Sequence, residues 1–165
     1  MKKLNIALVA HDARKKELIE WVKYNINTLK QHNLFATGTT GKLIENIDLP
    51  KETVNVHGLC YDVVEHPLSE CVTKLLSGPL GGDQQIGAMI AEGKLDVLIF
   101  FCDNLITQGH QQDVGALTRL ASLYNIAFAT NRTTADMIMT STLFGNENYD
   151  RIIPSSIEKY KNRTL

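Results

Sequence analysis

The stretch DVLIFFCD, residues 96–103, decides the fold class of this chain. Its apolar residues follow one another without the polar alternation of a half-exposed strand. A continuous apolar run of this length is typical of a central strand in a parallel sheet, where helices cover both faces. We therefore predict a strand here that is buried between two layers of helices.

Short apolar runs alternate with longer amphipathic segments on either side of this strand. Further strands are predicted within residues 4–10, 33–41, 72–79 and 127–131, and helices within 18–29, 41–47, 83–93, 113–125 and 133–141. This alternation predicts an α/β fold: a single small doubly wound domain over residues 1–165, with a five-stranded parallel sheet flanked by helices. Residues 48–72 do not fit the pattern of short connections and are predicted to be an insertion.

Composition excludes several classes of protein. The chain has 165 residues, 44% of them hydrophobic and 21% charged, which suits one compact domain. Its net charge of −1 argues against a nucleic-acid partner. No run approaches the ~20 apolar residues of a membrane span, and Asn5 interrupts the N-terminal run, which favours a strand over a signal peptide. Three cysteines without a CxxC pair indicate reduced thiols and a cytoplasmic location.

Polar residues follow four of the predicted strands. These groups are His11-Asp12, Thr37 to Gly41, Ser77 to Asp83, and Asp103 to His110. The carboxyl ends of parallel strands meet at one edge of a sheet, which is where ligands bind in such folds. The sequence therefore predicts a small-molecule site at this edge.

The stretch TGTTG, Thr37 to Gly41, has two interpretations. Its amides and hydroxyls suit a phosphate cradle, but they also suit an ordinary helix start with turn glycines. The cations at 14–16 lie at the positive end of a predicted helix, which indicates either a bound anion or plain solvation. Asp12 and Asp113 each precede a predicted helix and have N-cap roles as their alternative.

Asp83 lies within SGPLGGDQQIG, residues 77–87, a glycine-rich stretch of the kind that wraps phosphate. Its simple interpretation is an acid in the first turn of a helix, which complements the helix dipole. A carboxylate beside a phosphate site is also what proton abstraction from a phosphorylated sugar requires.

Four side chains of zinc-ligand type lie in the predicted insertion: His57, Cys60, His66 and Cys71. Their spacing matches no metal-site pattern, so we expect loop packing with buried thiols and no bound metal.

The chain resembles the methylglyoxal synthase family in segments spread from Ile6 to Asp136. They are IALVAHD with Lys15 shortly after it, LFATGTTG, SGPLGGDQQIGAMIAEGKLDVLIFF, the acid and histidine of CDNLITQGHQQDV, and FATNRTTAD. The resemblance implies conversion of dihydroxyacetone phosphate to methylglyoxal and inorganic phosphate by a homohexamer, without metal or organic cofactor. Inorganic phosphate is expected to inhibit, because the reaction releases it in the site.

The resemblance also implies the site residues. The expected catalytic residues are Asp83, His110, Asp113 and Asp12. The expected substrate- and phosphate-binding residues are His11, Lys15, Thr37, Gly38, Thr39, Thr40, Ser77, Gly78 and Asp103.

Two departures from the family pattern lie near His110. Asn104 replaces a proline after Asp103, and Gly109 and Gln112 stand where the family commonly has prolines. Two alternatives to the synthase use the same kind of site. A regulatory binding domain, like the allosteric domain of carbamoyl phosphate synthetase, needs the cradle without the acid–base pair, and an isomerase would release no phosphate.

Overall fold

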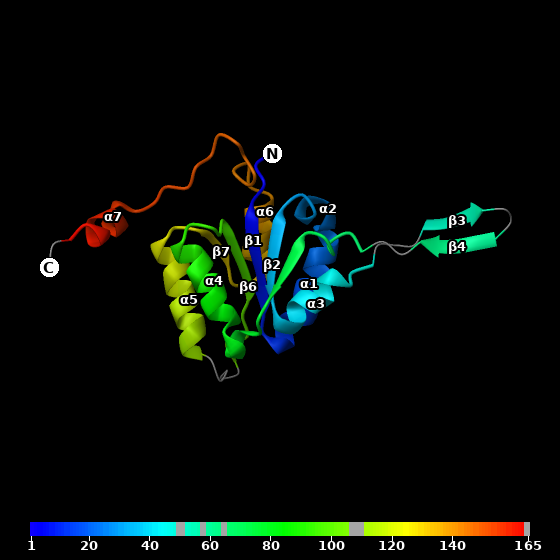
Figure 1. Cartoon of the computed structure of the whole chain (residues 1–165), viewed down its shortest axis with the longest axis horizontal. Coiled ribbons are helices and arrows are strands. Elements are labelled where there is room, and N and C mark those ends of the chain that lie inside the picture. Colours follow the sequence, from blue (N-terminus) through cyan, green and yellow to red (C-terminus); the bar gives the residue numbers. More distant parts are fainter. Residues whose placement is uncertain (49–51, 57–58, 64–65, 106–110, 164–165) are drawn as a thin grey trace.

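A computed structural model describes residues 1–48, 52–56, 59–63, 66–105 and 111–163. Its main sheet has five parallel strands in the order β5-β2-β1-β6-β7 (Figure 1). The strands are β1 (Asn5–Ala10), β2 (Asn33–Thr37), β5 (Val72–Leu75), β6 (Val97–Phe101) and β7 (Ala127–Ala129). Parallel pairing throughout confirms the predicted α/β class and the five-stranded sheet.

The two central strands bury residues on both faces of the sheet. In β1, Ile6 and Leu8 belong to one hydrophobic cluster, whereas Ala7 and Val9 belong to the other. All five residues of β6 are buried in the same alternating way. This double burial explains why the sequence of β6 shows no polar alternation.

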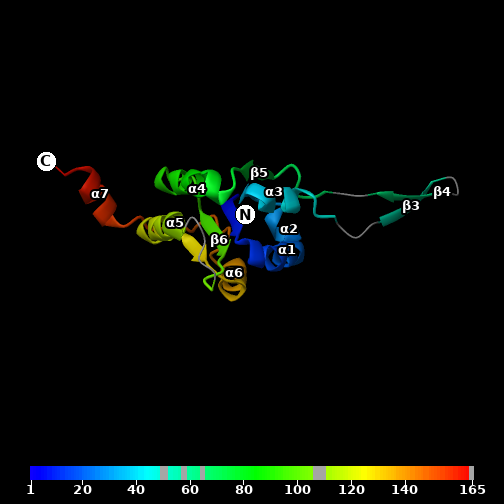
Figure 2. The ribbon, with the colours of Figure 1, turned by 90° about the horizontal axis from the view of Figure 1, so that it is seen from below.

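Helices cover both faces, as the sequence predicts. The larger cluster packs under α1 (Lys15–Tyr24), α2 (Ile26–Leu29), α3 (Gly38–Glu45) and α6 (Arg132–Met139). The smaller cluster packs under α4 (Gly82–Ala91) and α5 (Gln111–Leu123). Figure 2 shows these two layers in end view, on either side of the sheet. No helix of the described residues is long and apolar enough to cross a membrane.

One predicted helix is in fact two. Leu18, Val22, Ile26 and Leu29 were expected on one continuous helical face, and all four are buried. The helix ends at Tyr24, however, and a short second helix begins at Ile26. Asn25 lies between them, and its side-chain amide donates a hydrogen bond to the Trp21 carbonyl at 2.9 Å. Local side chain–backbone bonding of this kind competes with continued helix.

Two elements extend from the body of the molecule. An antiparallel hairpin of β3 (Glu52–Val56) and β4 (Leu59–Val63) lies within residues 48–72 and projects away from the sheet (Figures 1 and 2). The chain rejoins the core after it, because Leu68 is fully buried in the larger cluster. The C-terminal helix α7 (Ser155–Lys161) lies beyond the other side of the body (Figure 1).

His32 is buried near the start of the sheet. Its Nδ1 accepts a hydrogen bond from the Leu4 amide at 3.2 Å, and its ring meets that of Phe144 edge-on at 5.2 Å. The pKa of His32 is lowered, mainly because burial disfavours the charged ring and secondarily because Lys3 repels it. The folded protein therefore holds this histidine neutral.

Protonation of His32 should destabilise the fold. The unfolded chain, where a histidine has a pKa near ~6.5, binds the proton more readily than the folded chain. The contribution of neutral His32 to the free energy of unfolding is complete at pH values above the unfolded-state pKa. It is lost as the pH falls toward the folded-state pKa, by at most ~1.4 kcal/mol per pH unit. Urea unfolding at about pH 7.5 and about pH 5.5 gives the free energy of unfolding at each pH. This free energy should fall less between the two pH values in His32→Gln than in the wild type. Equal losses in the two proteins would contradict this assignment.

Candidate functional site

A cavity of about 380 Å³ opens at the carboxyl ends of the strands. It lies where the order of connections reverses: from β1 the chain moves outward to β2 and β5, then crosses back to β6 on the other side. Such a switch point leaves a crevice, because the two neighbouring strands send their connections in opposite directions. The position of the cavity therefore follows from the strand order and does not depend on particular side chains.

Most of the predicted site residues line this cavity. They are His11, Asp12, Lys15, Thr37, Gly38, Thr39, Thr40, Ser77, Gly78 and Asp83. Asp103 and Asp113 are not among the lining residues, and His110 lies outside the described residues. The sequence pattern did not single out Val9, Ala10, Pro79 and Phe100, which supply an apolar part of the wall. Their only sequence signal is their position at or near a strand end or within the glycine-rich stretch.

The stretch TGTTG proves to be the first turn of a helix rather than a loop before one. The helix was predicted from Gly41, but α3 begins at Gly38 with Thr37 at the N-cap position. The Thr37 side chain makes no capping hydrogen bond. The first-turn amides of α3, which have no partners within the helix, are at the cavity wall together with the threonine side chains.

Gly38 lets two segments approach each other closely. Its φ is +47°, in the left-handed region that favours glycine. A Cβ at this position would lie 2.8 Å from the Cβ of Ser77. The amide of Gly38 also donates to the carbonyl of Leu76 at 3.2 Å. The start of α3 and the segment after β5 therefore form one continuous wall.

Lys15 joins two parts of the site. Its Nζ donates to Asp12 at 2.5 Å and also to the hydroxyl of Thr39. The pKa of the Asp12 carboxyl is lowered, chiefly by this hydrogen bond and by the charge of Lys15. Arg14 pairs with Glu17 at 2.8 Å, so two of the three cations at 14–16 have acidic partners within the chain.

The two N-cap predictions are wrong. Asp12 is the first residue of a short 3-10 helix, η1 (Asp12–Arg14), and its carboxylate pairs with Lys15 instead of capping. Asp113 is the third residue of α5, which begins at Gln111. In both cases the acid lies inside the helix and not at its N-cap position.

Asp83 is buried beside the cavity. It is the second residue of α4, and only 2% of its surface is exposed. The short 3-10 helix η2 (Gly78–Leu80) carries the chain from Ser77 to this position. Gly82 permits the turn, because a Cβ there would lie 2.1 Å from the Leu76 carbonyl oxygen. The predicted first-turn position of Asp83 is confirmed.

His11 has a defined orientation. Its Nδ1 accepts a hydrogen bond from the backbone amide of Asp103 at 2.8 Å, and its ring meets Phe100 edge-on at 5.0 Å. An Nδ1 that accepts cannot carry a proton, so the neutral ring carries its proton on Nε2. Asp103 therefore acts on the site through its backbone, while its carboxylate accepts from the Leu105 amide at 3.1 Å.

Cysteine and metal chemistry find no support in the described part of the chain. Burial raises the pKa of the Cys102 thiol to about 11, and burial likewise raises that of Cys71. Both thiols are therefore protonated near neutral pH. No group of three or more His, Cys, Asp and Glu side chains is placed to hold a metal ion among the described residues. His57 and the side chain of Cys60 lie outside them.

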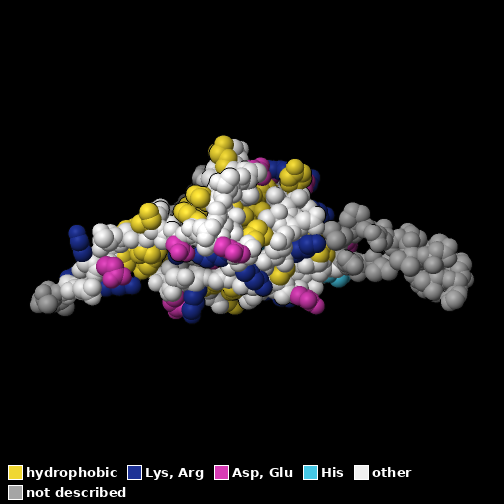
Figure 3. All heavy atoms as spheres, turned by 90° about the horizontal axis from the view of Figure 1, so that it is seen from above, with side chains coloured by type: hydrophobic (Ala, Val, Ile, Leu, Met, Phe, Trp, Pro, Cys, Tyr) yellow, Lys and Arg dark blue, Asp and Glu magenta, His cyan; other side chains and the backbone are white. Residues whose placement is uncertain are grey.

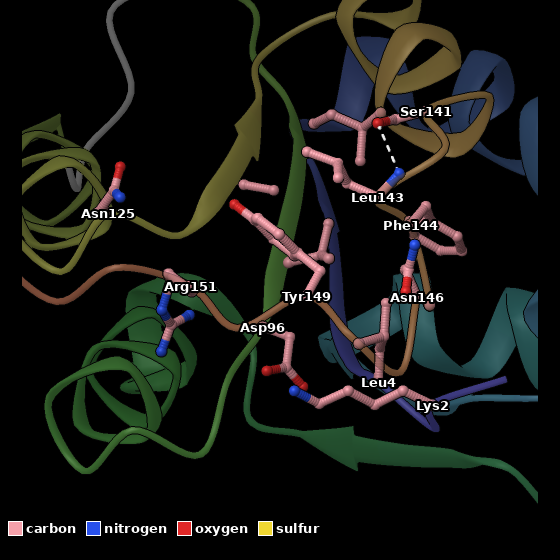
Figure 4. A pocket seen from close by; sticks show the side chains of 14 residues that line it. Lys2, Leu4, Asp96, Asn125, Ser141, Leu143, Phe144, Asn146, Tyr149 and Arg151 are labelled. Atoms are coloured by element: carbon pink, nitrogen blue, oxygen red, sulfur yellow. Dashed lines mark hydrogen bonds between the residues drawn. The ribbon is translucent and has the colours of Figure 1, made fainter.

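A second cavity, of about 190 Å³, lies at the opposite end of the strands (Figure 4). Its lining includes Tyr149 and Arg151 from the segment after α6, and Lys2 and Leu4 from the N-terminal segment (Figure 4). Figure 3 shows that this end of the molecule carries hydrophobic and charged side chains interspersed over its surface. None of the predicted site residues lines this second cavity.

The contact between Gly38 and Ser77 predicts an effect on stability. Gly38→Ala should lower the free energy of unfolding by about 1–3 kcal/mol, because the new Cβ meets Ser77 and the φ is unfavourable. Gly115→Ala is the matched control: nothing lies within 4 Å of a Cβ there, so this change should stabilise α5 by about 0.5–1 kcal/mol. Urea unfolding of both variants checks the prediction, and a Gly38→Ala protein as stable as the wild type would refute it.

Comparisons with known proteins agree on one family. Residues 63–130 match the family model described as MGS-like domain. The methylglyoxal synthase of Proteus mirabilis is 51% identical over 90% of this chain and 84% of its own length. That of Coxiella burnetii is 47% identical over 97% of this chain and 96% of its own. The crystal structure of methylglyoxal synthase from Elizabethkingia anophelis superposes with a TM-score of 0.78 at 40% identity, covering 99% of this chain and 93% of that one. The chain therefore belongs to the methylglyoxal synthase family.

Proposed function

We propose that this protein converts dihydroxyacetone phosphate to methylglyoxal and inorganic phosphate. The observation that carries the proposal is a buried carboxylate, Asp83, in the wall of a cavity that also holds the hydroxyls of Thr37, Thr39, Thr40 and Ser77 and the cation Lys15. In a site that only binds phosphate, a carboxylate at this point would weaken binding, because its negative charge repels the phosphate anion. A site that removes a proton next to a phosphate group requires one.

The phosphate group would lie between the start of α3 and the segment after β5. The Gly38 amide is taken by Leu76, but the amides of Thr39 and Thr40 and the hydroxyls of Thr37, Thr39 and Ser77 can act as donors there, and Lys15 supplies a positive charge. Helix N-termini with such donors are favourable anion sites. Free inorganic phosphate should occupy the same place and inhibit the enzyme.

Asp83 is better suited than Asp12 to be the base. The side chain of Asp12 is 95% exposed and tied to Lys15, which stabilises its charge and makes it a weaker proton acceptor. Asp83 is buried and sits at the cavity wall on the helix that follows the cradle. Asp83 would take a proton from the hydroxyl-bearing carbon of the substrate, and the electron pair would move to the carbonyl oxygen to give an enediolate.

We propose that His11 stabilises the enediolate oxygen. Because the Asp103 amide holds Nδ1 as an acceptor, Nε2 is the donor that the neutral ring offers. A neutral histidine donor of this kind is an established way to polarise a carbonyl without fully transferring a proton. The roles assigned by resemblance to His110 and Asp113 stay predictions.

Phosphate departure distinguishes this reaction from isomerisation. The enediolate expels phosphate when the bridging C–O bond stands out of its plane. The hydroxyl of the deprotonated carbon then gives its proton to water and becomes the aldehyde carbonyl. The C=C electron pair shifts to join the central carbon to the phosphate-bearing carbon, and the bridging C–O bond breaks with its electron pair leaving on phosphate. The donors of the cradle would hold the bond in that orientation and stabilise the leaving dianion. The enol that remains takes up a proton on carbon and becomes methylglyoxal.

Segments outside the cavity complete the proposal. None of the described cavity residues comes from residues 48–72, so we propose that this insertion in a single domain is not needed for the chemistry. The free thiols Cys71 and Cys102 support a cytoplasmic location. The homohexamer implied by the resemblance stays a prediction.

One assay tests the proposed activity against its two alternatives. Incubation with dihydroxyacetone phosphate should release methylglyoxal and inorganic phosphate in equal amounts. Glyceraldehyde 3-phosphate without phosphate release would identify an isomerase. Phosphate binding without any turnover would identify a regulatory binding domain.

Asp83→Asn separates catalysis from binding. The change is nearly isosteric and removes the base, so turnover should fall by at least ~10²–10⁴-fold. It also removes a charge that repels the phosphate dianion, by roughly 3 kcal/mol per charge pair at ~6 Å and an effective dielectric of ~20, before screening. Calorimetry with a non-reacting phosphate ester should therefore show binding at least as tight as in the wild type. If binding were lost together with activity, Asp83 would be a structural residue and the base would lie elsewhere.

A further inference from the structure

The peptide group of Leu76 connects the two halves of the candidate site. Its carbonyl accepts the hydrogen bond from the Gly38 amide at 3.2 Å, at the start of α3. Its own amide donates to the side-chain oxygen of Gln85 at 2.9 Å, on α4. Leu76 therefore lies between α3, whose first turn is the stretch TGTTG, and α4, which carries Asp83.

There is little free space around this peptide group. The Cα of Gly82 lies against the Leu76 carbonyl, and Gly38 lies against the neighbouring Ser77. A shift of Leu76 would therefore move Ser77, and it would change the contact with the first residue of α3. The Leu76 amide is held by the hydrogen bond that it donates to the side-chain oxygen of Gln85.

We propose that Gln85 is a positioning residue, which sets the register between the cradle and Asp83 by holding the Leu76 amide. The proposal rests on the proposed function of the site. Gln85 is exposed and does not line the cavity, so it acts through Leu76 and not on the substrate. It lies two residues after Asp83 on α4. One turn of this helix therefore carries both the proposed base and the side chain that accepts the hydrogen bond from the Leu76 amide.

Gln84 provides a matched control. It is also an exposed glutamine on α4, next to Gln85, and its side chain makes no hydrogen bond among the described residues. Gln85→Met removes the acceptor at nearly constant length, and Gln84→Met makes the same chemical change where no bond is lost. Gln85→Glu keeps an acceptor but adds a charge near the phosphate site, and Gln84→Glu adds the same charge one position away.

The experiment measures inorganic phosphate binding by calorimetry, kcat and KM, and hydrogen exchange of the Leu76 amide in the four variants. In Gln85→Met, we expect about a three- to tenfold loss of phosphate affinity, a similar loss of kcat, and faster Leu76 exchange. Gln84→Met should match the wild type. Gln85→Glu should match Gln84→Glu, because both keep the bond and share the added charge.

Two results would overturn the proposal. The first is a Gln85→Met protein with wild-type phosphate affinity and kcat, including one that is merely less stable to heat. The second is a Gln85→Glu protein as impaired as Gln85→Met while Gln84→Glu is not, which would show that the acceptor does not matter. Phosphate binding needs no turnover, so a wild-type protein without activity would refute the proposed function and still leave the role of Gln85 testable.

Discussion

The parallel pairing of β1 with β6, buried on both faces, is the constraint on which the rest of the structure depends. Residues Ile6 to Ala10 pair in register with Val97 to Phe101, and their side chains alternate between the two hydrophobic clusters. Because helices cover both faces of the sheet, a ligand can reach these strands only at their ends. Because connections from β1 and β6 diverge, the crevice between them stays open. His11 follows one of these strands and Phe100 belongs to the other, so the cavity is built directly on this pair.

Close backbone approach then determines the shape of the site. Glycine at positions 38 and 82 allows the segment after β5 to lie against the starts of both α3 and α4. No side chain larger than a hydrogen atom fits at either contact without displacement. The hydrogen bonds of the Leu76 peptide group span the same junction, one to Gly38 at the start of α3 and one to Gln85 on α4. The glycine-rich character of the stretch thus serves packing between segments.

The distribution of charge explains why neighbouring acids differ. Asp12 and Asp83 line one cavity, but Asp12 is exposed and neutralised by Lys15, whereas Asp83 is buried at the start of α4. Lys15 is in turn bonded to Thr39, so the cation is held beside the first turn of α3. The two carboxylates of this cavity therefore have different surroundings: one is exposed and paired with a cation, and the other is buried in the first turn of a helix.

The sequence by itself determined the five strands of the main sheet, most of the helices around it and the identity of the polar groups, because these depend on local periodicity and composition. The apolar run 97–101 required a strand covered on both faces, and the polar groups after successive strands had to meet at one edge of a parallel sheet. The family motifs around Asp83 and TGTTG added the chemistry. Only the tertiary structure decided the start of α3 at Gly38, the break at Asn25 and the different burial of Asp83 and Asp12. The proton position on His11 likewise depends on the Asp103 amide, 92 residues away in the chain. Such features arise from contacts between distant segments, and a linear pattern contains no signal for them.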